Sequence, residues 1–240
     1  MSGATLYRWP ESARFERSIP KSKFYEQGNV SPAVRQKFVS EVQKISWAYK
    51  LAESTVNLAG NDEVPEIQVF EIEAKGDDVD VAVLSAIDRS IPYPIVFEIA
   101  AKANGTPKVK LVACHKQLRT GKPKLSEYFA EPWTDSDQTR TPLPAAIDLP
   151  ALYASLLSPM LPSSARSGET VADSAERMAE IAKREREVAK LERKLRNEPQ
   201  FNRKVEVRRE LKEREAALQR LTKTTIDSEE QDVKDQRWTS

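Results

Sequence analysis

The sequence has few of the residues on which many enzymes and metalloproteins depend. Among its 240 residues are one cysteine, Cys114, one histidine, His115, and only seven glycines. A single cysteine excludes an intramolecular disulfide, and one Cys with one His cannot build a Cys/His zinc site. The glycines form no phosphate-binding loop, and neither a G-x-S-x-G nor an H-E-x-x-H motif occurs. We therefore expect no metal and no cofactor, and enzyme activity has no positive support.

Long apolar runs are missing as well. No segment approaches the 18 or so consecutive apolar residues that a membrane-spanning helix requires. The first 21 residues carry charges where a secretory signal would need an apolar stretch. Together with the cysteine content, which is typical of a reducing compartment, these features predict a cytoplasmic protein.

Neither sign of charge dominates the chain. There are 38 Lys and Arg residues against 37 Asp and Glu residues, which leaves a formal net charge of +1. Global charge therefore does not argue for a nucleic-acid partner, and only a local patch could do so. Because charged residues make up 31% of the chain, part of it must be solvated helix or tail rather than core.

Residues 65–101 have the pattern of a strand, an amphipathic helix and a second strand. The first segment is rich in β-branched and aromatic residues, and in the last segment apolar residues alternate on one face. Between them, apolar residues recur at helical spacing at Val83, Leu84, Ile87 and Ile91. We expect Asp77 or Asp78 to cap this helix, and Pro92 and Pro94 to end it. This unit is the predicted nucleus of the core.

Patterns on either side of this unit complete an α+β domain over residues 1–157. Before residue 31, the prolines favour an extended arm anchored by one or two aromatic residues over a regular helix. The other expected elements are a helix from Ser31-Pro32, a strand over 45–51, a hairpin at Asn104-Gly105, a turn over 121–123, an edge strand over 126–133, a loop over 134–146 and a helix over 149–157 capped by Asp148. We predict a small, mostly antiparallel sheet with packed helices.

The composition changes after residue 157. Residues 158–174 are rich in Ser, Pro and small residues, which indicates a linker. Residues 175–223 are almost free of Gly and Pro, have apolar residues seven apart, and are interrupted only near Pro199. Two helices with narrow apolar seams and a short break predict an antiparallel helical hairpin, a coiled coil, followed by a flexible tail over 224–240.

The hairpin provides the two sets of candidate binding residues. Basic residues gather near its expected tip and could grip phosphate: Lys190, Arg193, Lys194, Arg196, Arg203, Lys204, Arg208 and Arg209. The seam residues could bury against a protein partner or a second copy of the chain: Val188, Leu191, Leu195, Leu211 and Leu218. The competing interpretation of the basic residues is a solvated coiled-coil face with i,i+4 ion pairs.

Acidic residues around the central unit raise the alternative of a divergent metal-dependent nuclease. The candidate metal ligands are Glu66, Glu71, Glu73 and Glu98, and Glu73-Ala74-Lys75 matches the Glu-x-Lys of restriction-type folds. Strand periodicity opposes this, because Glu66 and Glu73 are an odd number of residues apart and should lie on opposite faces of one strand. The same rule sends Cys114 and His115 to opposite faces, so they cannot act as a nucleophile and its base.

Several motifs carry a family resemblance. IPKSKFY, VQKISWAYKLAESTVNL, EIQVFEIEA, AIDRSIPYPIVFEI, EYF-x3-W, DLPALYASLL and QFNRKVEVRRELK resemble the bacterial family catalogued as domain of unknown function 4391. Members look like accessory genes beside helicases, DNA methyltransferases and restriction-type nucleases in anti-phage islands, and the family has no established catalytic residues to carry over. Separately, KLRNEPQFNRKV is similar to the C-terminal coiled-coil arm of valyl-tRNA synthetase, which contacts tRNA, although Pro199 departs from that arm.

These observations lead to one principal hypothesis and two alternatives. The principal one is a non-enzymatic accessory subunit of a bacterial anti-phage defence or restriction-like complex. We expect it to dock on a helicase, methyltransferase or nuclease, with the basic hairpin touching DNA or RNA. The alternatives are the divergent nuclease and a structural coiled-coil homodimer.

Overall fold

A computed structural model describes residues 5–27, 30–103, 105–118, 123–161 and 169–222. The chain forms two compact units, residues 1–161 and 162–240. The turn expected over 121–123 and the tail expected over 224–240 lie wholly or largely outside the described residues, as do residues 162–168 of the expected linker. Within the described ranges, no helix is both long and apolar enough to cross a membrane.

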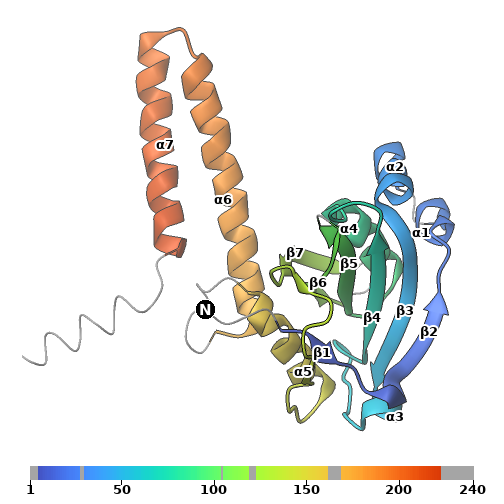
Figure 1. Cartoon of the computed structure of the whole chain (residues 1–240). Helices are drawn as coiled ribbons and strands as arrows, with labels where there is room; N and C mark the ends of the chain where they lie inside the picture. The colour runs from blue at the N-terminus through green and yellow to red at the C-terminus, as the bar shows by residue number, and fades with distance from the viewer. Residues whose placement is uncertain (1–4, 28–29, 104, 119–122, 162–168, 223–240) are drawn as a thin grey trace, which may run out of the picture. The chain divides into compact units, whose positions relative to one another are not determined.

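The first unit is built on a mixed sheet (Figure 1). Its main strands, in spatial order, are β2 (Arg14–Ser18), β3 (Val42–Ala52), β4 (Glu66–Ala74), β5 (Ile95–Ala103), β6 (Thr106–Gln117) and β7 (Lys124–Ala130), and β8 (Thr134–Asp135) also pairs with β6. Neighbouring strands are antiparallel except β4 and β5, which are parallel. The predicted α+β class with a mostly antiparallel sheet is confirmed; the sheet has seven strands, and one neighbouring pair in it is parallel.

The parallel pair follows from the strand–helix–strand unit predicted over residues 65–101. Helix α4 (Val81–Ser90) connects β4 to β5 as a crossover, and a crossover returns the chain in the same direction. The predicted cap is wrong: Asp80 caps α4, its Oδ1 accepting from the Ala82 amide at 2.7 Å. Asp78 instead accepts a hydrogen bond from the neighbouring Val79 amide through its Oδ1, and the helix begins later than expected.

Helices cover both faces of the sheet. On one face, α2 (Pro32–Glu41) and α4 enclose a core that includes Phe38, Phe70, Val83, Leu84, Ile87 and Phe97, all fully buried. On the other face, α5 (Leu149–Leu157), capped by Asp148 as predicted, buries most of its side chains near β4 and β6. The Tyr153 hydroxyl ties α5 to β6 by donating to the Cys114 carbonyl at 2.5 Å.

The N-terminal arm is less extended than expected. It contains β1 (Tyr7–Arg8), η1 (Glu11–Ala13), β2 and a helix, α1 (Ser22–Gln27). The expectation of no helix is wrong because Pro20 lies just before α1, where a missing amide hydrogen costs nothing. Phe24 of α1 is buried and stacks on Phe38 with ring centroids 6.2 Å apart. Trp9 is also buried, which confirms the expected aromatic anchor.

Two short strands join the ends of the first unit. β1 pairs in parallel with β9 (Thr141–Pro142), inside the region expected to be a loop. The Thr141 amide donates to the Leu6 carbonyl at 2.8 Å. The remaining short elements are α3 (Glu53–Val56) and η2 (Ser158–Met160).

The second unit contains the predicted helical pair. Helices α6 (Val171–Asn197) and α7 (Phe201–Thr222) run antiparallel, side by side (Figure 1). Residues 198–200, including Pro199, form the connection between them. Val207 and Leu211 of α7 are buried, and Arg214 lies 3.6 Å from Glu187 across the pair.

Candidate functional site

The basic residues predicted at the hairpin tip are all exposed. They are Lys190, Arg193, Lys194 and Arg196 on α6 and Arg203, Lys204, Arg208 and Arg209 on α7. Because α6 ends at Asn197 and α7 begins at Phe201, every one lies within roughly two to three helical turns of the connection. Arg209 has an acidic neighbour, Glu213, at 3.6 Å. In the described part of the chain the other seven form no ion pair with an acid.

The predicted seam residues lie between the two helices to different degrees. Leu211 is buried, whereas Val188, Leu191, Leu195 and Leu218 are only partly buried. Two helices can cover only one side of each other's apolar seam, so a strip of this seam stays accessible. Whether a partner covers it remains a prediction.

The sequence also holds a second group of basic residues on and after β6, and its described members are engaged within the first unit. The group is Lys108, Lys110, Lys116, Arg119, Lys122 and Lys124. Lys108 contacts Asp135 at 2.7 Å, and Lys110 contacts Asp78 at 2.6 Å while its Nζ lies 4.7 Å from the Trp133 ring centroid. Arg119 and Lys122 lie outside the described residues. The described members therefore offer no free basic patch.

The four candidate nuclease carboxylates do not form one group. Glu66 lies in a buried position with Lys50 at 2.7 Å and the Gln68 side-chain amide at 2.6 Å. Glu73, seven residues along β4, pairs with Lys44 at 3.6 Å. Among the described residues, no three His, Cys, Asp or Glu side chains come close enough to hold a metal ion.

Glu71 and Glu98 do lie together, on the face opposite the α4 core. They occupy facing positions of the parallel strands β4 and β5. Glu98 is buried and already satisfied: Arg140 donates to both of its oxygens, and Trp9 Nε1 donates to Oε2 at 3.1 Å. Arg140 also donates to the Tyr7 carbonyl at 3.0 Å, so this group fastens the N-terminal arm over the sheet.

Glu71→Gln should slightly raise stability at neutral pH. Loss of hydration, and then the Glu98 charge, raise the pKa of Glu71 above its ordinary value. A raised pKa means that ionised Glu71 weakens the folded state, and this penalty appears as the pH rises from the unfolded-state pKa through the folded one. Glu71 is an exposed residue, so solvent screens its charge; we therefore expect Glu71→Gln to raise the free energy of unfolding by less than about 0.5 kcal/mol at pH 7 and not at pH 3. Urea unfolding at both pH values measures this; equal effects at the two would contradict it.

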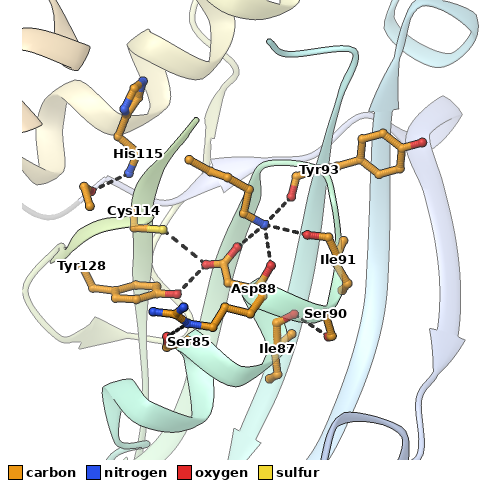
Figure 2. Close-up of polar contacts among 12 residues, drawn as sticks. Ser85, Ile87, Asp88, Ser90, Ile91, Tyr93, Cys114, His115 and Tyr128 are labelled. Atoms are coloured by element: carbon orange, nitrogen blue, oxygen red, sulfur yellow. Dashed lines mark hydrogen bonds and ion pairs between the residues drawn. The ribbon is translucent and has the colours of Figure 1, made fainter. Parts of the chain in front are cut away.

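A buried polar cluster lies where α4 meets β6 and β7 (Figure 2). The Asp88 carboxylate accepts from the Tyr128 hydroxyl at 2.6 Å and from the Cys114 thiol at 3.4 Å. Burial, and then the Asp88 charge, raise the pKa of both Cys114 and Tyr128, so both hold their protons. His115 points to the other face, with its ring 6.4 Å from that of Tyr153, as strand alternation predicts.

Lys116 completes this cluster from β6. Its fully buried Nζ lies 2.5 Å from Asp88 Oδ1. Its three protons go to the carbonyls of Asp88, Ile91 and Tyr93, at 2.9, 3.0 and 2.7 Å. The ammonium therefore caps the end of α4 and holds the loop that leads into β5. This arrangement is structural, since both charges are buried and matched.

A cavity of about 910 Å³ opens on the α4 side of the sheet. Residues from five parts of the chain line it: Arg17, Ser18, Ile19 and Pro20; Lys23 and Phe24 of α1; Val30, Ser31 and Val34; the strand residues Trp47, Gln68 and Phe70; and Ala82, Ser85, Ala86, Arg89, Ser90, Ile91, Pro92 and Tyr93. Sequence reasoning did not identify it, because no one segment carries its pattern. Asp88 had a detectable signal, since it is a charged residue four positions after Leu84 on the apolar stripe of a helix.

Comparison with known proteins gives one match. A family model described as domain of unknown function (DUF4391) matches residues 8–218. No curated protein and no solved structure matches the chain. The match spans most of both structural units, including most of the hairpin.

Proposed function

Because the chain belongs to the DUF4391 family, which is defined without an assigned activity, we propose its function from its own residues. The protein is a non-enzymatic accessory subunit of a bacterial nucleic-acid-processing complex, and its hairpin tip contacts the phosphate backbone. The family resemblance supplies the class of partner, a helicase, methyltransferase or nuclease of an anti-phage system. The half-covered seam of α6 and α7 offers a surface for such a partner.

One observation carries the nucleic-acid part of this proposal. Eight cations and four acids lie between residues 190 and 210, and seven of those cations form no ion pair with an acid in the described structure. A cation already paired with a carboxylate gains little from a phosphate, whereas an unpaired one releases counterions when it binds. The tip therefore differs from a coiled-coil face neutralised by i,i+4 pairs, such as Arg184 with Glu180 at 2.9 Å.

Charge reversal at the tip tests this proposal. The variant Arg203→Glu, Lys204→Glu, Arg208→Glu, Arg209→Glu should bind a DNA or RNA duplex at least tenfold more weakly. If all four residues contact phosphates, the slope of log affinity against log salt should flatten by about 3 to 4. Fluorescence anisotropy at several salt concentrations measures both quantities with the full chain.

The matched control reverses four cations farther from the tip on the same helices: Lys183, Arg186, Lys212 and Arg220. This variant has the same net charge, so an equal loss of affinity would show a general charge effect and contradict a tip site. The same two variants serve in a tagged pull-down from the native host. A stoichiometric protein partner that survives nuclease treatment supports the accessory role; recovery of nucleic acid alone contradicts it.

A further inference from the structure

The cavity on the α4 side of the sheet has the charge of an anion site. Three cations lie on its wall, Arg17, Lys23 and Arg89, and none of its lining residues is an Asp or a Glu. All three side chains belong to exposed residues, and none forms an ion pair with an acid within the described ranges. Arg89 is oriented by its Nε, which donates to Ser85 Oγ at 3.1 Å, and its two terminal nitrogens are left for a ligand. Such a fork suits a phosphate group.

The interior of the cavity adds an aromatic surface. The Trp47 ring packs against two other rings, with the Phe15 centroid at 4.2 Å and the Phe70 centroid at 6.1 Å. It therefore forms a fixed wall of the cavity. Tyr93 also lines the cavity, and its ring has no aromatic partner in the described structure. Figure 2 shows the Tyr93 ring directed away from Asp88. A half-exposed ring of this kind can stack on a planar ligand.

A buried polar group faces the same space. Gln68 is 3% exposed, lines the cavity, and donates from Nε2 to Glu66 Oε1 at 2.6 Å. This bond fixes the orientation of the amide, and no residue that the structure describes donates a hydrogen bond to its carbonyl oxygen Oε1. Because Gln68 lines the cavity, this acceptor is available to a ligand that brings an N–H group to it, and such a bond adds specificity.

From these three features we propose that the cavity binds a nucleoside phosphate. The phosphate contacts Arg17, Lys23 and Arg89, the base stacks on Tyr93, and a base N–H group donates to Gln68 Oε1. The volume lies within the range of about 300 to 1,000 Å³ that is typical of small-molecule sites. A free nucleotide and the phosphorylated end of a nucleic-acid strand present the same chemistry, and the experiment below separates them.

The buried cluster explains why this site is formed in advance. Lys116 Nζ binds the carbonyls of Ile91 and Tyr93, which fixes the loop that carries the Tyr93 ring. Since Asp88 holds Lys116 in turn, the loop does not need to be ordered when a ligand arrives. Lys116 is thus a positioning residue for the proposed site and does not contact the ligand.

Calorimetric titration of the full chain tests the proposal. The ligands are AMP, ADP, ATP and GMP, with adenosine, inorganic phosphate and a 5′-phosphorylated oligonucleotide as comparisons. We expect at least one nucleoside phosphate to bind more tightly than adenosine or phosphate. Lys23→Gln with Arg89→Gln should weaken it at least tenfold, as should Tyr93→Leu, while Tyr93→Phe keeps the affinity. The control, Lys212→Gln with Arg220→Gln, should leave it unchanged.

Two results would overturn the proposal: no nucleoside phosphate binds, or the cavity variants and the control bind equally well. Binding of inorganic phosphate as tight as that of any nucleotide would overturn the base contacts. The oligonucleotide is titrated into the tip-reversed variant, so that the hairpin does not contribute. Binding there that is lost in Lys23→Gln with Arg89→Gln assigns the cavity to strand ends; binding of free nucleotides alone assigns it to a small ligand. Failure of the hairpin proposal leaves these outcomes unaffected.

Discussion

Lys116→Met is expected to lower the free energy of unfolding by about 3 to 5 kcal/mol. The substitution keeps much of the side-chain volume but removes the charge opposite Asp88, which is itself fully buried. The carbonyls of Asp88, Ile91 and Tyr93 lose their donor in the same step. Breaking a buried pair by removing one partner is costly because the remaining charge is neither hydrated nor compensated. Urea unfolding followed by circular dichroism measures the loss.

Two further variants show whether burial is the cause. Lys110→Met removes an ion pair with Asp78, whose side chain is 48% exposed, and should cost no more than about 1 kcal/mol. Adding Asp88→Leu to Lys116→Met should recover only part of the loss, since the three carbonyls remain unsatisfied. A Lys116→Met protein as stable as the Lys110→Met protein would show that the buried pair contributes little.

Arg140→Met is expected to cost about 1.5 to 3 kcal/mol and to loosen the N-terminal arm. Arg140 donates to both oxygens of Glu98 and to the Tyr7 carbonyl. Without it, the Trp9 indole is the one donor left to Glu98 among the described residues, while the Glu98 side chain is only 7% exposed. The Tyr7 carbonyl loses its donor as well, so the two-stranded pair of β1 and β9 should open before the seven-stranded sheet.

Hydrogen exchange followed by mass spectrometry measures this opening. The amides around β1 and β9 should exchange faster in Arg140→Met, whereas those of β4 to β6 should change much less. Arg8→Met is the matched control, because Arg8 lies in the same arm but makes only an exposed bond of 3.4 Å to the Arg140 carbonyl. Unchanged exchange at residues 7–9 in Arg140→Met would exclude the proposed fastening.

The elements that could be predicted from sequence are those whose signal lies within one segment. The crossover β4–α4–β5 repeats apolar residues at periods of two and 3.6, and α6 and α7 repeat them every seven residues. Helix α1 could not be predicted, because six residues give no period and their stability comes from Phe24 packing on Phe38. The formation of α1 therefore depends on tertiary contacts rather than on a pattern in its own sequence.

The candidate sites follow the same rule: a site can be predicted from sequence when its residues lie close together along the chain. The basic tip could be predicted, since its residues lie within about twenty positions around one break in a helical pattern. The cavity could not, because Arg17, Gln68 and Arg89 come together only after β2, β4 and α4 have packed. The role of Arg140 was also hidden, since it sits in a polar segment expected to be a loop and its partner Glu98 is 42 residues earlier.

The pairing of β1 with β9 sets an order of events during synthesis. The Leu6 carbonyl accepts from Thr141, 135 residues further along the chain. The arm with Leu6, Tyr7 and Trp9, all buried in the finished unit, therefore leaves the ribosome well before Arg140 and Thr141 and must wait for them before it can dock. During that interval its apolar side chains are open to other contacts, including those of a chaperone.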